Sequence, residues 1–399
     1  MFSRNTLMKI AIVLDEEEQI SLPKARRYWV HPILRQRKRK GEFSTLYKEL
    51  IDDETKFHRY FRMSPNEFHQ LHEILKSDLT KQNTTFRESI SSLEKLAVCL
   101  RFLATGDSFQ TISFSYRLGH STVHAIVQEV CNAVIRKLLA VCIPTPRRKD
   151  WEKIAEQFWT TWNFPNCLGA LDGKHIEITA PSNSGSNYFN YKKTFSVVLL
   201  ALVDADYKFI AVDIGSYGKN SDGGIFSTSR LGKSLNNGTL DIPDCKNLPG
   251  TNIEAPYVIV GDSAFPLKAN LLRPYPELQV QGDMEKRIFN YRLCRARRVV
   301  ENAFGILAQR FRLYFRKINS KPNYIENIIL TTCILHNFLR NGTSVLSESS
   351  SSSEQNQPIF MALPGIGNNA RLEAFHDREK FTAFFNSEVG SVSWQNDKI

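Results

Sequence analysis

Three kinds of hydrophobic pattern follow one another along the chain. Over residues 64–139 the apolar residues recur at helical spacing, and the expected helices open with capping residues. Over 167–260 the apolar runs are short, rich in β-branched residues and separated by turn residues, which predicts strands. Helices are expected again over 286–315 and 324–339. The pattern therefore predicts an all-α module followed by a mixed α/β layer domain.

The last part of the helical module has the order of a helix-turn-helix. A helix over 93–103 is followed by a short helix over 109–115, a turn at 118–120 and a helix capped by Ser121. Polar side chains near the start and on the outer face of that last helix are the candidates for reading DNA: Thr122, His124 and Gln128. Because they are not basic, a purely structural three-helix bundle is the alternative interpretation.

Composition divides the chain into five parts. Residues 1–62 form a basic N-terminal region, 63–145 the helical module and 150–341 the α/β domain. The serine and glutamate stretch within 342–370 has the composition of a disordered linker. Residues 371–399 are expected to form a short helix and a tail.

Neither a membrane segment nor a zinc site is indicated. No apolar stretch approaches the roughly 20 residues that a bilayer span needs. The seven cysteines are scattered, without the spacing of zinc ligands. We therefore expect a soluble intracellular protein with reduced, buried thiols.

The charge balance favours a polyanionic partner. The chain has 52 Lys and Arg against 41 Asp and Glu, a net charge of +11. A basic run in the first region is a candidate for DNA contact or nuclear import, with a solvated basic loop as the alternative: Arg35, Arg37, Lys38, Arg39 and Lys40. The long helix carries eight arginines over 287–316 and one acid, Glu301, which favours a phosphate-rich ligand. Arg297 and Arg298 are its candidate phosphate contacts, although Arg297 could instead form an i,i+4 ion pair with Glu301.

Two carboxylates stand at the ends of apolar strands. Asp172 and Asp262 each follow such a run, and Glu301 lies on the flank of the apolar stripe of the long helix. Asp213 and Asp222 also lie near strand ends. Buried carboxylates need a cation, a proton or water. Asp172, Asp262 and Glu301 could together hold one or two Mg²⁺ or Mn²⁺ ions for phosphodiester cleavage, whereas simple pairing with Lys or Arg is the alternative.

Five segments, in order, resemble the motif blocks of PIF/Harbinger transposases and of the nuclease that animals derive from them. The first block ends in Ala170-Leu171-Asp172-Gly173-Lys174-His175. The others are 215–226, 258–265, 296–305 and 335–338, and the resemblance extends over about residues 90–340.

This resemblance implies an RNase H-like fold with a DDE triad at Asp172, Asp262 and Glu301. It also implies divalent-metal nuclease and strand-transfer chemistry on DNA in the nucleus. The cytoplasm is a second expected location of the protein. The family's transposases are similar in needing a Myb-like, SANT-type partner protein. Paired cuts at two DNA ends would call for a homodimer.

A metal-dependent DNA endonuclease is therefore the leading hypothesis. The main alternative is a domesticated DNA- or chromatin-binding adaptor whose nuclease site is inactive. An intact triad beside an arginine-rich helix favours the enzyme, because an unused site is free to lose its acids. A transcription factor that uses the helical module alone would leave more than half of the chain unexplained.

Overall fold

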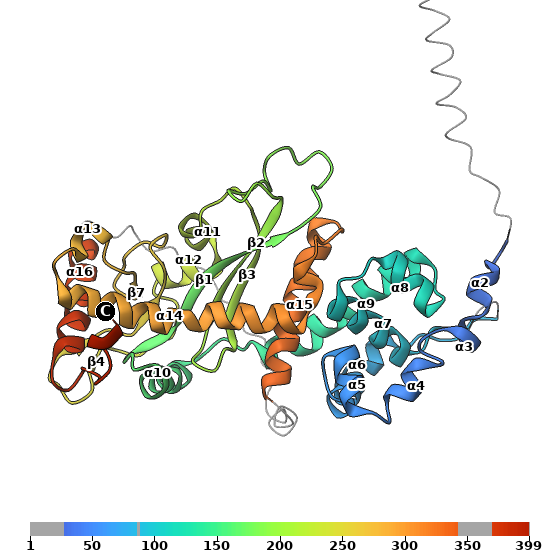
Figure 1. Ribbon diagram of the computed structural model, residues 1–399, viewed down its shortest axis with the longest axis horizontal. Coiled ribbons are helices and arrows are strands. Elements are labelled where there is room, and N and C mark those ends of the chain that lie inside the picture. The colour runs from blue at the N-terminus through green and yellow to red at the C-terminus, as the bar shows by residue number, and fades with distance from the viewer. Residues whose placement is uncertain (1–27, 86–87, 342–368, 399) are drawn as a thin grey trace, which may run out of the picture.

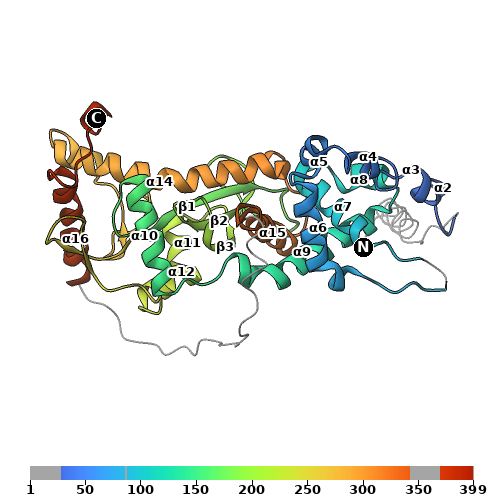
Figure 2. The same ribbon diagram turned by 90° about the horizontal axis from the view of Figure 1, so that it is seen from below.

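The computed structural model describes residues 28–85, 88–341 and 369–398. They form an elongated molecule, with an all-helical part at one end and an α/β domain at the other (Figures 1 and 2). The helical part contains α2 (Pro32–Arg35), α3 (Arg37–Lys40), α4 (Leu46–Leu50), α5 (Glu54–Phe61), α6 (Pro65–Leu79), α7 (Ser92–Thr105), α8 (Phe109–Tyr116) and α9 (His120–Cys142).

Local capping sets where these helices begin. Ser64 and Glu67 form a reciprocal capping box at the start of α6, and the hydroxyl of Ser91 accepts a hydrogen bond from the backbone N–H of Glu94 in α7. The helical core begins before residue 63, because the rings of Tyr47 and Phe61 pack on Phe68. The segment 43–61 is therefore part of the helical core as well as part of the basic region.

The α/β domain is built on one five-stranded mixed sheet, as the hydrophobic pattern predicted. Its strand order is β3-β2-β1-β6-β7, in which β2 is antiparallel to β1 and β3, whereas β6 and β7 run parallel to β1. The elements are α10 (Arg148–Trp162), β1 (Cys167–Glu177), β2 (Ser196–Val203), β3 (Phe209–Tyr217), α11 (Asp222–Thr228), α12 (Arg230–Asn236), β4 (Lys246–Asn247), β5 (Glu254–Ala255), β6 (Val258–Val260), β7 (Leu271–Leu272), α13 (Glu277–Val280), α14 (Met284–Arg310), η1 (Arg312–Phe315), α15 (Pro322–Asn341), α16 (Asn369–Asn386) and η3 (Asn396–Lys398).

Helices cover both faces of the sheet (Figure 2). On one face Ala170 and Ile176 of β1 share an apolar cluster with the buried stripe of α14, which includes Leu293 and Val300. On the other face Leu171 shares a second cluster with residues of α10 and α11. Because side chains alternate along a strand, the even-numbered positions of β1 from Ala170 onward point towards α14 and the odd-numbered ones towards α11.

One edge of β1 is open over its second half. Strand β6 pairs with β1 only as far as Ala170 opposite Val260, whereas β2 continues to pair with β1 up to Glu177 opposite Ser196. From Asp172 to Ile176 β1 therefore has a strand on one side only, and beyond it the Glu177 carbonyl accepts a hydrogen bond from the Ile318 N–H at 3.1 Å. This open edge is where the candidate site lies.

The C-terminal segment holds the middle of α14 in place. The guanidinium of Arg292 is fully buried and donates hydrogen bonds to the Gly390 carbonyl at 3.1 Å and the Gln395 side-chain oxygen at 3.0 Å. It also donates to the Asn163 carbonyl at the end of α10. Helix α16, which confirms the short helix expected after residue 370, thus belongs to the α/β domain together with its tail.

The serine-rich stretch expected to be a linker, 342–370, lies almost wholly outside the described residues. No helix in the described part of the chain is both long and apolar enough to span a membrane. All seven cysteines are free and five are buried, but Cys245 is exposed, so the expectation of buried thiols is wrong for that residue.

Asn337 connects three elements of the domain. Its side-chain oxygen accepts a hydrogen bond from the Phe209 N–H of β3 at 2.9 Å. Its side-chain N–H groups donate to the carbonyls of Phe209 and of Cys142 at the end of α9, both at 2.8 Å. Asn337 is 2% exposed. The last turn of α15 is thereby bound to the sheet and to the helical part.

We expect Asn337→Ala to lower the free energy of unfolding by about 2–4 kcal/mol, because it leaves three buried backbone groups without partners. The measurement is denaturant unfolding. Asn327→Ala is the matched control on the same helix, since Asn327 makes a single exposed hydrogen bond to Asn132. Equal, small losses in the two variants would contradict the assigned role of Asn337.

Candidate active site

Three aspartates meet at the open edge of β1. Asp172, Asp222 and Asp262 each place a carboxylate oxygen within 4.8 Å of the others. They come from three elements: Asp172 from β1, Asp222 from the first turn of α11, and Asp262 from the loop that follows β6. The parallel pairing of β1 and β6 accounts for two of them, because it brings the end of β6 beside the middle of β1.

Local hydrogen bonds fix the two acids outside β1. The side chain of Asp262 accepts a hydrogen bond from the backbone N–H of Ala264 at 2.9 Å, which shapes the turn after β6. The hydroxyl of Ser221 caps α11 by accepting from the Gly224 N–H at 3.3 Å, so Asp222 lies in the first turn of that helix. The positive end of the helix dipole favours a carboxylate there.

The acids are held in an unfavourable electrostatic environment. Burial raises the pKa of Asp172 to about 6, and the neighbouring Asp262 and Asp222 act in the same direction. The Gly173 N–H and the guanidinium of Arg297 oppose this rise. Burial and then Asp262 raise the pKa of Asp222 to about 6. The Oδ1 atom of Asp222 is buried and has no hydrogen-bond partner among the described residues. A buried, unpartnered carboxylate oxygen among two further acids is suited to a cation.

A glycine makes room for this arrangement. A Cβ atom at Gly173 would lie 2.2 Å from the Oδ1 atom of Asp222 and 2.7 Å from its carboxyl carbon. Any side chain at position 173 would therefore displace the carboxylate from β1. The glycine that follows Asp172 in the sequence is thus part of the construction of the site.

Glu301, the third acid expected from the sequence, does not belong to this group. Its carboxylate forms an ion pair with Arg297 one turn earlier on α14, with an N–O distance of 2.6 Å, and its side chain is 46% exposed. The structure thus shows the i,i+4 pair that was the alternative interpretation of Arg297. Arg297 also opposes the rise in the pKa of Asp172, so the guanidinium that pairs with Glu301 is coupled electrostatically to the acidic cluster. A role of Glu301 as a metal ligand stays a prediction.

Asp222 is the member of the cluster that sequence reasoning did not select. It carried two signals: an acid near a strand end, and a position in the block 215–226. Both applied less directly to Asp222 than to Asp172 and Asp262, because Asp222 begins a helix rather than ending an apolar strand.

The candidate DNA-reading residues of α9 are partly engaged within the fold. The ring of His124 packs edge-on against Phe109 and against Tyr324 of α15, with centroids 5.1 and 5.2 Å apart. Gln128 is 8% exposed, so the expectation that it reads DNA is wrong in this conformation. Thr122 lies half-buried in the first turn of α9. Base reading by Thr122 and His124 stays a prediction.

The basic run lies in the two short helices α2 and α3. Arg37 approaches the buried Glu94 of α7 to 3.9 Å and its side chain is 18% exposed, so it has a role within the fold. Lys38 pairs with Glu88 on the surface. Arg39 and Lys40 are exposed and Arg35 is also on the surface. The run thus remains available for a polyanion except at Arg37.

The excess of arginine over residues 287–316 has an internal explanation in part, and α14 ends at Arg310, so Arg312 and Arg316 lie beyond the helix that was expected to hold them. Arg292 is hydrogen-bonded to the C-terminal segment, and the guanidinium of Arg295 lies 4.3 Å from the centre of the Trp394 ring. Arg316 pairs with Asp107. Arg298 is exposed on the surface of the helix. Counting all eight arginines towards a phosphate ligand was therefore an overestimate.

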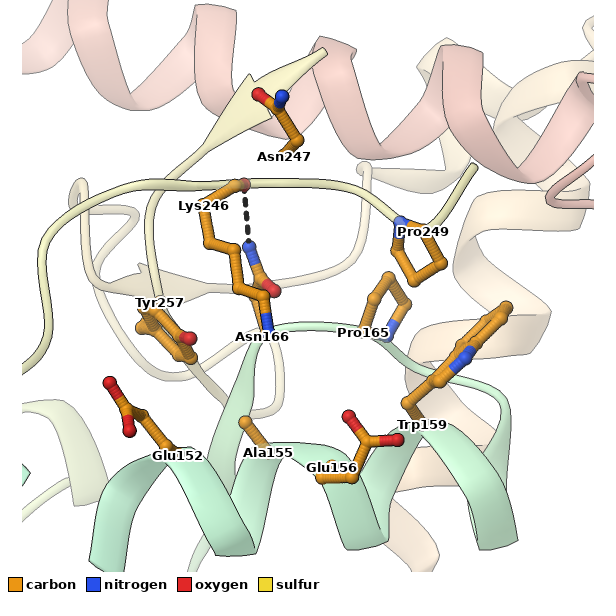
Figure 3. Close-up of a pocket in the computed structure, with 10 residues that line it drawn as sticks. All are labelled: Glu152, Ala155, Glu156, Trp159, Pro165, Asn166, Lys246, Asn247, Pro249 and Tyr257. Carbon is orange, nitrogen blue, oxygen red and sulfur yellow. Dashed lines mark hydrogen bonds between the residues drawn. The ribbon is translucent and has the colours of Figure 1, made fainter. Parts of the chain in front are cut away.

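A separate cavity of about 240 Å³ lies at the other ends of β1 and β6, around Asn166 and Tyr257 (Figure 3). Glu152 and Glu156 of α10 line it, and the Asn166 side chain donates to the Lys246 carbonyl at 3.1 Å. None of the three clustered aspartates contributes to this cavity. It is therefore not part of the candidate active site.

We expect Gly173→Ala to weaken Mn²⁺ binding at least about tenfold, because the new methyl group displaces the Asp222 carboxylate. The measurement is calorimetric titration of the full chain with MnCl₂. Gly305→Ala is the control, since Gly305 lies on a helix and a methyl group added there would point into open space. Wild-type affinity for Mn²⁺ in Gly173→Ala would contradict this construction of the site.

Comparisons with known proteins agree with this geometry. The family model described as DDE superfamily endonuclease matches residues 171–337, which include all three aspartates and Glu301. A domain of unknown function (DUF8040) matches residues 43–136 of the helical part. No solved structure matches the chain significantly.

Curated relatives extend the comparison. The Arabidopsis thaliana protein named Protein ALP1-like is 29% identical over 74% of this chain and 72% of its own length. A second Arabidopsis thaliana protein, named Antagonist of like heterochromatin protein 1, is 27% identical over 72% of this chain and 74% of its own. The Homo sapiens protein named "Putative nuclease HARBI1" is 23% identical over 71% of this chain and 77% of its own. Residues 171–337 thus form a domain of the DDE superfamily endonuclease family with the acidic cluster inside it, and the similarities to these relatives support the resemblance to PIF/Harbinger transposases and transposase-derived nucleases.

Proposed function

We propose that this protein is a divalent-metal-dependent DNA endonuclease and that Asp172, Asp222 and Asp262 form its metal site. The observation that carries the proposal is the meeting of three carboxylates from three separate elements, one of which has a buried oxygen without a partner among the described residues. Pairing with Lys or Arg, the alternative interpretation of strand-end acids, leaves that oxygen unexplained.

The donor set fits Mg²⁺ or Mn²⁺, because hard divalent cations take carboxylate oxygens and keep positions for water and phosphate. Bound there, one or two such ions would activate the attacking oxygen and stabilise the leaving one in phosphodiester hydrolysis. Arg297, beside Asp172, is suited to orient a substrate phosphate. If Arg297 bound a phosphate, its ion pair with Glu301 would be released. We propose that Glu301 then completes the DDE triad with Asp172 and Asp262.

The order of the sheet supports an RNase H-like catalytic domain. Three antiparallel strands are followed on one side by two parallel ones, in the order β3-β2-β1-β6-β7. The acids lie on the central strand and just after its parallel neighbour. This arrangement agrees with the fold that the motif resemblance implies.

The remaining features of the proposal rest on family resemblance and charge. DNA is the substrate that nuclease relatives imply. We further propose strand transfer at the same site, action in the nucleus, a Myb-like partner protein and a homodimer that joins two DNA ends. The helix-turn-helix order of α7, α8 and α9 supports a DNA-binding role for the helical part.

The second candidate function is a DNA- or chromatin-binding adaptor with an inactive nuclease site. What favours it is the name of one relative, Antagonist of like heterochromatin protein 1, which describes a role opposed to another protein and no cleavage. The adaptor keeps the DNA-binding surfaces and has no use for the metal.

Nicking of supercoiled plasmid DNA in Mn²⁺ separates the two functions. We expect the wild type to nick, and Asp172→Asn, Asp222→Asn and Asp262→Asn to lose nicking while they still bind DNA. Asp206→Asn is the control, because Asp206 lies in the exposed turn between β2 and β3. Absence of nicking by the wild type, with DNA binding retained, would favour the adaptor. Equal nicking by all variants would disprove the site.

Glu301→Gln tests the fourth acid in the same assay. Loss of nicking is expected if Glu301 completes the triad after Arg297 binds phosphate. Nicking at the wild-type rate would remove Glu301 from the catalytic site and leave the three aspartates as the complete set of acids.

The basic run predicts a salt effect. Replacing Arg35, Lys38, Arg39 and Lys40 with Ala, while Arg37 is kept for its contact with Glu94, should weaken DNA binding and reduce the slope of log K against log salt by about 0.9 per lost phosphate contact. Fluorescence anisotropy at several salt concentrations measures the slope. An unchanged slope would limit the run to nuclear import.

A further inference from the structure

The hairpin that joins β1 to β2 ends in an exposed aromatic tip. We define the hairpin tip as residues 188–195. Within it Tyr191 is 77% exposed and Phe189 is 42% exposed. The connection projects beyond the end of the sheet, away from α10 and α14 (Figure 1). The Phe189 ring packs against Phe195, with centroids 5.4 Å apart, whereas the Tyr191 ring is mostly exposed.

A buried amide holds the hairpin tip in one conformation. The side-chain oxygen of Asn190, a residue only 4% exposed, accepts hydrogen bonds from the N–H groups of Lys192 at 2.9 Å and Thr194 at 3.1 Å. Its side-chain N–H groups donate to the hydroxyls of Thr194 and Ser196. Ser196 in turn shares a 2.9 Å hydrogen bond with His175 of β1. The neighbour of Tyr191 is thus fixed to the sheet, which presents the ring in a preorganised position.

Lysine side chains lie at and near the exposed ring. Lys192 and Lys193 are exposed, and the Lys192 ammonium lies 5.4 Å from the centre of the Tyr191 ring. Lys219, from the segment after β3, donates to the Asn187 side chain at 2.7 Å and so adds a third cation at the base of the tip. Glu177, the last residue of β1, is the exposed acid on this strand end. The tip therefore combines an exposed aromatic ring with an excess of positive charge.

The hairpin tip is continuous with the acidic cluster through β1. Tyr191 packs edge-on against His175, with centroids 5.4 Å apart, and His175 is three residues from Asp172, roughly 10 Å along an extended strand. Lys174 lies between them and shares a strand face with Asp172. Strand β1 thus connects the Tyr191 ring, through His175, to the acidic cluster.

We propose that the hairpin tip is a stacking platform for an unpaired DNA base next to the cleaved phosphodiester, with the Tyr191 ring against the base and Lys192 and Lys193 on the flanking phosphates. Exposed aromatic rings beside a basic track are the usual means of binding single-stranded nucleic acid, because every base has a face on which a ring can stack. A purely electrostatic contact would use the lysines without the ring. The substrate would accordingly be duplex DNA that is locally unpaired beside the cut. This inference rests on the proposed DNA endonuclease.

The test uses the Asp172→Asn chain without divalent metal, so that binding is read independently of cleavage. Two DNA ligands are compared: a fully paired duplex, and the same duplex with a short unpaired stretch that carries 2-aminopurine. We expect tighter binding of the second ligand and a change in 2-aminopurine fluorescence. Adding Tyr191→Ala should reduce affinity for it about tenfold and abolish the fluorescence change, while binding of the paired duplex changes less than about twofold.

Matched variants separate stacking from other effects. Tyr191→Phe should keep the preference, because the ring is retained, and Phe375→Ala on α16 is a control at an exposed aromatic residue outside the hairpin tip. If Tyr191→Ala binds each of the two ligands as tightly as its Asp172→Asn parent does, the platform is overturned. A uniform loss on both ligands would also overturn it, since it would indicate charge alone. Failure of the wild type to nick plasmid DNA would count against the endonuclease and leave this binding result readable.

Discussion

The candidate site depends on a fold that holds three carboxylates close together in a partly buried position, although they repel one another. Burial is the largest of the effects that raise the pKa of Asp172 and of Asp222 to about 6. The acids remain together because each belongs to an element that is fixed by other contacts: a central strand, a capped helix and the turn after β6. Folding thus positions charges that would separate if they were free, and we propose a divalent cation as the partner that offsets their repulsion.

The open edge of β1 makes the cluster accessible. Had β6 continued beside β1 beyond Ala170, its backbone would cover the edge at which Asp172 lies. The two faces of the sheet are covered, by α14 and α15 on one side and α10 and α11 on the other, so the edge is the remaining approach to Asp172. The tail after α16 stabilises this arrangement because it binds Arg292 of α14, which lies five residues before Arg297 on the same helix.

Sequence periodicity was sufficient for many of the elements, and insufficient for the contacts between distant elements. The strands around Asp172 and Asp262 and the apolar stripe of α14 are local patterns, and the structure confirms them. The expectation that a strand ends at Asp172 is wrong, because β1 continues to Glu177, and the pattern did not indicate α10. Asp222 was missed as a site residue because its approach to Gly173 joins segments about fifty positions apart and depends on the absence of a side chain.

The predicted ligand contacts of the arginines and of Gln128 in α9 were wrong in part for a related reason. Nothing near Arg292 in the sequence indicates that residues 390–395 will bury it. Gln128 has the local character of a reading residue, yet it is buried in the assembled helical part. Charge and polarity indicate function only after the long-range packing is known, and long-range packing is what a single sequence specifies least directly.

The most direct test of the account is anomalous X-ray diffraction from crystals of the full chain soaked in MnCl₂. The account predicts a manganese peak among the carboxylates of Asp172, Asp222 and Asp262, and its loss in crystals of Asp222→Asn. Manganese bound elsewhere, or no bound manganese in a protein that still cleaves DNA with Mn²⁺, would contradict it.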